Sequence, residues 1–302
     1  MTVGLMAGQW CAYGLIPDLP GDQRYEAGGS LVFDSEPLTE ATEILGAPLL
    51  TLELESDQPV AMIAGVLSEV LPDGAATRIS FGLLNLTHRD SHEYPEPLEP
   101  GKRYTVTLQL NDCGHKFEVG NRIRIALSDV YWPIAWPAPE KTILTLSTGD
   151  STLTLPLRPT DEADAALRPF EEPEAAAPLN ATQVTPAGYS NEITHDIVTG
   201  RVTQRQWTDE GTIIYEDHNG WTVSSTHDEV FSVDPNEPQS AEIDITWTEN
   251  FSRGAWEISS KTRTQIRVTA THFIIRGELS AHMGDELVHE QVWNREIPRD
   301  LV

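Results

Sequence analysis

Cysteine, positive charge and long apolar runs are all scarce in this 302-residue sequence. The two cysteines, Cys11 and Cys113, are too few for a disulfide framework or a zinc cluster. The longest apolar run, residues 60–67, is far shorter than the roughly 20 residues that a membrane-spanning helix needs. The first cationic residue is Arg24, so the N-terminus lacks the charged region of a secretory signal. We therefore expect a cytoplasmic protein with two incidental thiols.

Basic residues are outnumbered by acidic ones. Lysine and arginine total 20 against 47 aspartates and glutamates, which gives a formal net charge of -27. A surface this negative repels phosphate backbones and anionic lipid, so we expect neither a nucleic-acid nor a membrane partner. Hydrophobic residues make up 39% of the chain, which is typical of a folded protein rather than a disordered one.

Helical periodicity is also hard to find. Short apolar segments bounded by Gly, Pro, Asn and Asp recur at roughly ten-residue intervals, the spacing of short strands in sandwiches and barrels. In residues 104–110, Tyr104, Val106 and Leu108 alternate with threonine and glutamine, which is typical of a strand with one buried face. The sequence therefore predicts an all-β protein, and the density of such segments before residue 158 predicts a β-sandwich there.

Composition sets off an acidic Pro-rich linker, which separates a sandwich with its N-terminal arm from a C-terminal β domain. In the last part Ile243, Ile245 and Trp247 share one face of an alternating segment, which predicts that Trp247 belongs to a core. We expect this part to be a second antiparallel β domain, either a curved sheet or an open barrel. The expected bounds of the four parts are residues 1–24, 25–158, 159–186 and 187–302.

Several collinear motifs in the first half of the chain resemble one family. They are residues 30–38 (SLVFDSEPL), 45–48 (LGAP), 84–92 (LNLTHRDSH), 120–124 (GNRIR) and 131–137 (YWPIAWP). Together they resemble the C-terminal domain of X-prolyl dipeptidyl-peptidases and cocaine-esterase-type (CocE/NonD) serine hydrolases over about residues 5–158. This resemblance implies a jelly-roll sandwich of galactose-binding-like form. Residues 187–302 resemble an extra C-terminal domain of longer bacterial members of the group.

The catalytic residues of that family lie in an α/β-hydrolase domain that precedes the jelly-roll. The resemblance therefore implies that the chain carries no catalytic residue and is a truncated or split product whose partner is a missing or separately encoded hydrolase domain. The residues agree, because no Gly-x-Ser-x-Gly elbow occurs, and the nearest approach, Gly28-Gly29-Ser30, has Val32 in place of the second glycine. We expect a non-catalytic portion that shapes the substrate pocket and the assembly of an acyl-ester or X-Pro-amide hydrolase, and that is inactive alone.

Two groups of residues are candidates for contact with a ligand. By resemblance, Trp10, Cys11 and Tyr13 line the acyl-binding pocket next to the hydrolase domain. Tyr131, Trp132 and Trp136 lie among prolines, in a loop that either stacks on a sugar or an apolar ligand or plugs the mouth of the sandwich. The alternative function is therefore that of a free-standing module that binds a carbohydrate or a small ligand, or of an oligomerisation domain that forms a homo-oligomer.

His88 and His92, with Asp90 and Glu93, form the densest set of ionisable side chains. Their spacing would converge on a metal only on a helix. Because they follow a β-segment and precede Tyr94-Pro95, the sequence favours a loop that is held by side-chain to backbone hydrogen bonds. We expect no metal site and no cofactor.

Overall fold

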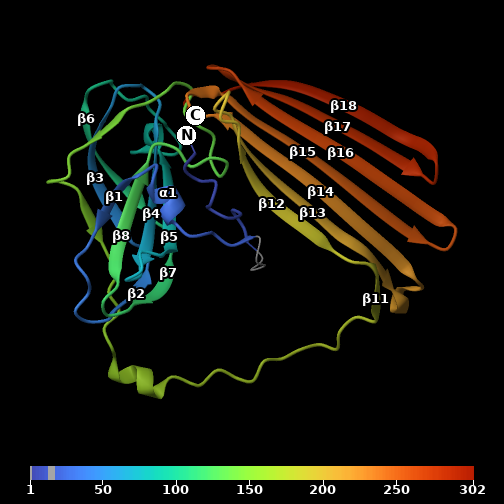
Figure 1. Ribbon diagram of the computed structural model, residues 1–302, viewed down its shortest axis with the longest axis horizontal. Helices are drawn as coiled ribbons and strands as arrows, with labels where there is room; N and C mark the ends of the chain where they lie inside the picture. Colours follow the sequence, from blue (N-terminus) through green and yellow to red (C-terminus); the bar gives the residue numbers. More distant parts are fainter. Residues whose placement is uncertain (1, 13–17) are drawn as a thin grey trace. The chain divides into compact units, whose positions relative to one another are not determined.

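The computed structural model describes residues 2–12 and 18–302, and it is built almost entirely from antiparallel strands (Figure 1). This confirms the all-β fold class. The chain divides into two compact units. Unit 1 comprises residues 1–159, 234–239 and 299–302, and unit 2 comprises residues 160–233 and 240–298. None of the helices in the described residues is long and apolar enough to cross a membrane.

Unit 1 contains two sheets of four strands and a two-stranded ribbon. The first sheet has the order β1-β8-β4-β5, and the second has the order β10-β3-β6 with β9 also paired to β3. In the first sheet the strands are β1 (Leu31–Asp34), β8 (Arg122–Ser128), β4 (Met62–Val70) and β5 (Ala76–Asn85). In the second they are β10 (Thr152–Thr154), β3 (Leu49–Ser56), β6 (Arg103–Gln109) and β9 (Leu144–Leu146). The ribbon pairs β2 (Thr42–Gly46) with β7 (Cys113–Phe117).

One hydrophobic core joins the two sheets of unit 1 into a sandwich. On β3, Leu50, Leu52 and Leu54 are buried and the intervening residues are half-buried, as the alternating sequence predicts. These leucines belong to the same cluster as Ile63 of β4 and Leu127 of β8. Strand β4 lies between two neighbours and is buried at every position.

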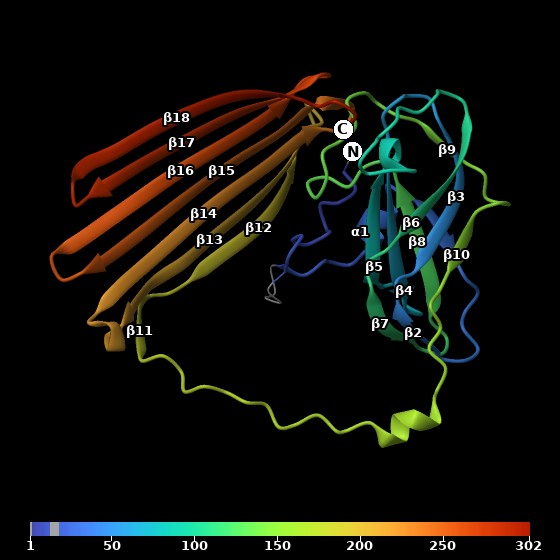
Figure 2. The ribbon, with the colours of Figure 1, turned by 180° about the vertical axis from the view of Figure 1, so that it is seen from behind.

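Unit 2 is one antiparallel sheet with the order β11-β13-β14-β15-β16-β17-β18, and β12 also pairs with β13 (Figure 2). The hairpin between β15 and β16 turns at Gly254, where a φ of 61° suits glycine. The sheet is open, because within the described residues β18 is paired on one side only. The strands are β11 (Ala181–Thr185), β12 (Gly188–His195), β13 (Val202–Tyr215), β14 (Trp221–Asp234), β15 (Glu237–Arg253), β16 (Trp256–Val268), β17 (His272–Met283) and β18 (Glu286–Pro298).

Trp247 of β15 lies on the expected face of the strand, but it is less buried than expected. Trp247 shares a face with Ile243 and Ile245, yet 41% of its surface is exposed. The prediction that it belongs to a core is therefore wrong, because alternation sets the face of a side chain and not whether another layer covers that face.

The acidic Pro-rich segment contains a 3-10 helix, η3 (Glu162–Ala166), and strand β11. Asp161 accepts a hydrogen bond from the Ala163 backbone N–H and caps this helix. Residues 165–187 are exposed throughout.

Candidate functional site

The N-terminal arm, in its described residues 2–12, lies on unit 1 through alternate buried side chains. Val3, Leu5 and Ala7 are 5%, 3% and 1% exposed. This segment is the part of the chain that the family resemblance places nearest to a hydrolase domain. The side chains of unit 1 that hold it are therefore the first candidates for a functional role.

Glu26 is the main polar anchor of the arm. It lies on the short helix α1 (Arg24–Ala27) and is 3% exposed. Its two carboxylate oxygens accept hydrogen bonds from the backbone N–H groups of Gly4, at 2.6 Å, and Met6, at 2.5 Å. Burial raises the pKa of Glu26, against the opposing effects of these two donors and of nearby Arg78. One buried side chain therefore satisfies two backbone donors of a segment about twenty residues away.

Arg78 of β5 is the second anchor. Its Nη1 donates to the Ala7 carbonyl oxygen at 2.6 Å and to the Tyr131 hydroxyl at 3.2 Å. The guanidinium carbon also lies 4.5 Å from the centre of the Phe81 ring, a cation–π distance. Arg78 therefore links the arm, the sheet and the aromatic–proline loop within unit 1.

An aromatic row continues from this anchor to the surface. The rings of Tyr131 and Phe81 are stacked with centroids 5.7 Å apart, and the ring of Trp10 meets Phe81 edge-on at 6.0 Å. Trp10 is 68% exposed and Cys11 is exposed too. Tyr13 lies outside the described residues. The structure thus brings Trp10 together with Tyr131, two residues that the sequence assigns to separate groups.

The aromatic–proline loop packs inside unit 1. Tyr131 and Trp132 are fully buried, and the ring of Trp136 meets that of Trp132 at 4.9 Å and 61°. The Trp132 backbone N–H donates to the Val3 carbonyl oxygen at 3.0 Å. A Cβ added to Gly4 would lie 2.4 Å from the Trp132 carbonyl oxygen, which leaves room for glycine alone. These contacts favour packing over ligand stacking for Tyr131 and Trp132.

The last four residues of the chain also belong to unit 1. Arg299 is 2% exposed and its Nη2 donates to the Pro137 carbonyl oxygen at 2.6 Å. Burial lowers the pKa of its guanidinium. The Leu301 carbonyl oxygen accepts from Asn85 Nδ2 at 2.7 Å and from Thr87 Oγ1 at 2.9 Å. Through Arg299, the C-terminal residues therefore hold the aromatic–proline loop in place.

The ionisable cluster at residues 88–93 lies in and after a 3-10 helix, η2 (Leu86–His88). The Nδ1 atoms of His88 and His92 are 3.3 Å apart. Asn85 Oδ1 accepts from the Thr87 N–H at 3.1 Å, and Ser91 Oγ accepts from the N–H groups of Glu93 and Tyr94. Among the residues that the structure describes, no group of three or more His, Cys, Asp or Glu side chains could hold a metal ion. Hydrogen bonds that hold a loop account for this motif.

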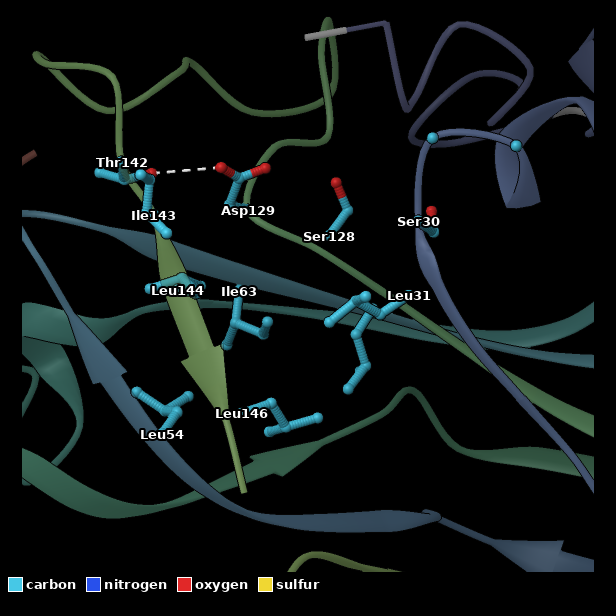
Figure 3. Close-up of a pocket in the computed structure, with 13 residues that line it drawn as sticks. Ser30, Leu31, Leu54, Ile63, Ser128, Asp129, Thr142, Ile143, Leu144 and Leu146 are labelled. Atoms are coloured by element: carbon cyan, nitrogen blue, oxygen red, sulfur yellow. Dashed lines mark hydrogen bonds between the residues drawn. The ribbon is translucent and has the colours of Figure 1, made fainter. Parts of the chain in front are cut away.

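Figure 3 shows a cavity of about 500 Å³ at the edge of the sandwich, between β1, β8 and β9. Its wall is mainly leucine and isoleucine, and Thr142 Oγ1 lies 3.3 Å from Asp129 Oδ2 at the rim. A second cavity of about 210 Å³ shares Leu127 and Leu146 with it. Ser30 lines the larger cavity, but its hydroxyl donates to the Glu26 carbonyl oxygen at 3.0 Å and no histidine is present among the described lining residues. The site can bind apolar groups, and it holds no activated serine.

Sequence reasoning missed Glu26, Arg78 and Arg299 as organising residues. A glutamate beside Tyr25 and an arginine within an alternating strand carry no signal of burial. The partners through which they hold the arm and the aromatic–proline loop lie between 20 and 162 residues away in the chain.

The comparisons with known proteins concern mostly unit 1. Residues 5–169 match the family model of the X-Pro dipeptidyl-peptidase C-terminal non-catalytic domain. The cocaine esterase of Rhodococcus sp. (strain MB1 Bresler) is 27% identical over 116 residues, which are 38% of this chain and 20% of the esterase. The chain thus matches one fifth of that relative's length.

Solved structures give weaker similarity. An α-amino acid ester hydrolase is 23% identical with a TM-score of 0.44, over 45% of this chain and 27% of that protein. A CocE/NonD family hydrolase from Staphylococcus aureus is 16% identical with a TM-score of 0.38, over 45% of this chain and 32% of that protein.

Proposed function

Because the chain belongs to the family of X-Pro dipeptidyl-peptidase C-terminal non-catalytic domains, we propose that it supports the pocket and the assembly of a serine hydrolase that cleaves acyl esters or X-Pro amides. In this proposal the nucleophile comes from a separate α/β-hydrolase domain. The chain supplies an apolar surface at the entrance of the acyl pocket.

The anchored N-terminal arm is the observation that carries this proposal. Glu26 and Arg78 fix the arm through three of its backbone groups, and Trp10 emerges next to Phe81 with 68% of its surface exposed. A large exposed ring held by a rigid support is suited to pack against an acyl group or against another domain, because little side-chain entropy is lost on contact.

The first test is an activity assay of the purified 302-residue chain. We expect no hydrolysis of p-nitrophenyl esters or X-Pro amides and no labelling by a fluorophosphonate probe, since a serine needs a base and an oxyanion site to react. Labelling of a single serine would overturn the non-catalytic role.

The second test is binding to the α/β-hydrolase domain of a family member, produced separately and measured by calorimetry. Trp10→Ala should weaken binding about tenfold or more, as expected for an interface anchor. Tyr94→Ala is the matched control, because Tyr94 is also an aromatic residue of unit 1 and is 71% exposed. Equal losses for both variants, or no binding by the unaltered chain, would contradict a pocket-supporting role.

The cellular location that fits this role best is the cytoplasm. Cys11 is an exposed free thiol, and exposed thiols persist in reducing compartments. Fractionation of the native host with an antibody against the chain tests the location.

A second candidate function is binding of a small apolar ligand in the cavity of Figure 3. Ile143 lines that cavity and is 64% exposed, so Ile143→Glu should abolish saturable binding of a fluorescent aliphatic probe without loss of the fold. Val119→Glu, at a residue that is 60% exposed elsewhere on unit 1, is the control.

A further inference from the structure

The sheet of unit 2 has one aromatic face, which the strand register defines. Ile245 pairs with Thr264, Thr264 with Gly277 and Gly277 with Trp293, so these four residues point to the same side. Trp247 is on the same side of β15 as Ile245. We call this side the aromatic face.

Ring contacts extend the aromatic face across β13 and β14. The His227 ring is parallel to that of Trp247 at 4.2 Å, and the Trp221 ring lies between those of Phe251, at 6.2 Å, and Tyr215, at 6.0 Å. Aromatic side chains from neighbouring strands therefore form continuous rows on this face.

The opposite face of the same sheet carries paired charged side chains, which suit contact with water. Bidentate ion pairs join Arg263 to Asp244 and Arg205 to Asp228 across neighbouring strands, and Arg267 Nε lies 2.8 Å from a Glu242 oxygen. An antiparallel sheet with one charged and one apolar face normally packs the apolar face against another layer.

That apolar face is open over much of its area. The exposed fractions are 37% for Trp221, 41% for Trp247, 45% for Trp256, 40% for Trp293 and 54% for Met283, all of which lie on the aromatic face. Contiguous apolar surface of this kind marks an interaction site rather than a surface adapted to water.

Charge favours a second copy of this chain as the occupant. The chain carries a formal charge of -27, so two copies repel each other over most of their surfaces. The register and the ring contacts put five formally charged side chains on the aromatic face, three acidic and two basic: Glu229, Glu249, Glu286, Arg253 and Arg295. Burial raises the pKa of Glu229. The aromatic face is thus where self-association meets little repulsion.

The size of the face is sufficient for a stable dimer. With strands about 4.8 Å apart and about 3.3 Å per residue, the six adjacent strands β13 to β18, each of a dozen residues or more, cover on the order of 1,000 Å². A standard interface needs roughly 800 Å² from each partner. Tryptophan is also the residue type most enriched at the energetic centre of interfaces.

We propose that the protein is a homodimer in which the aromatic faces of two unit 2 sheets pack against each other. The two copies bury the same residues, as a twofold interface requires, and the two sheets form one sandwich about 10 Å thick. This proposal is independent of the proposed function, because it concerns residues outside the N-terminal arm.

Sedimentation equilibrium of the full 302-residue chain tests the proposal. We expect a dimer, and a tryptophan emission that shifts to the red on dilution as the aromatic face is exposed. Trp247→Glu and Met283→Glu should each raise the dimer dissociation constant about tenfold or more. Thr248→Glu adds the same charge to the charged face of β15, opposite Lys261, and should leave the constant unchanged.

Far-UV circular dichroism should show the same strand content in all variants, and Trp247→Phe should retain the dimer. Three results would overturn the proposal. They are a monomer at every concentration, a dimer that both glutamate variants leave intact, and a monomer that instead co-sediments with phosphatidylcholine vesicles through the same tryptophans.

Discussion

Replacing Glu26 by alanine should release the N-terminal arm from unit 1. The carboxylate is 3% exposed and accepts the backbone N–H groups of Gly4 and Met6. Without it these two donors lose their acceptor in a site that is buried at Gly4 and partly buried at Met6. The arm should then leave the sandwich, because an unsatisfied buried donor costs more than an exposed one.

The magnitude follows from the two hydrogen bonds. A hydrogen bond to a charged group contributes about 1.5–3 kcal/mol, so the pair contributes about 3–6 kcal/mol before the cost of burying the carboxylate. That cost is real, since burial raises the pKa of Glu26 in spite of both donors. We therefore expect a net loss of about 3 kcal/mol in the local stability of the arm, which is roughly a 100-fold change in its opening equilibrium.

Hydrogen exchange followed by mass spectrometry measures this change. Peptides that contain residues 2–12 should exchange roughly 100-fold faster in Glu26→Ala than in the unaltered chain. Glu26→Gln keeps one carbonyl oxygen and should give an intermediate rate. Peptides from β16, which is in the other unit, serve as the internal reference.

Unchanged exchange in residues 2–12 of the Glu26→Ala variant would refute this reasoning. It would mean that the burial of Val3 and Leu5, with the hydrogen bond from Arg78 to Ala7, holds the arm without Glu26. A uniform acceleration over the whole of unit 1 would also contradict it, because the effect would then be global unfolding.

Three further predictions concern single residues of unit 1. Arg299→Ala should lower the urea-unfolding stability of unit 1 by about 1–3 kcal/mol, since it leaves a buried carbonyl acceptor unpaired. Gly4→Ala should lower the melting temperature more than Gly101→Ala, because both glycines have positive φ but only at Gly4 would the Cβ meet backbone, at 2.4 Å. Hydrogen bonds from Arg24 lower the pKa of Asp22 to about 2, so the stability that Asp22→Asn removes should be present above about pH 4 and lost as the pH falls through about 2. The side chains of Asp22 and Arg24 are both exposed, so the stability of Asp22→Asn should differ from that of the unaltered chain by no more than about 1 kcal/mol. Thermal melts recorded at a series of pH values measure this difference.

The sequence predicts the strands well because alternation is a local property. Leu50, Leu52 and Leu54 face the core as their spacing requires, and the β15–β16 turn falls at a glycine, Gly254. The anchors of the site are not local. Arg299 meets its carbonyl partner 162 residues away, and nothing near either residue indicates the contact. In the aromatic–proline loop the sequence favours packing but leaves stacking on a ligand open, because only the neighbours that cover Tyr131 decide between them.

The sheet of unit 2 shows what the alternation of apolar and polar residues predicts and what it does not. Its period of two separates Ile245 and Trp247 from Asp244 and Thr246, and the structure confirms this separation through the register with β16. Alternation does not indicate whether a second layer covers the apolar face, so the same pattern describes a strand in a sandwich and a strand in a single sheet. The ion pair of Asp244 with Arg263 shows that one face has its partners within the sheet. The tryptophans of the other face remain partly exposed and gain most from a second layer, which a copy of the same sheet can provide.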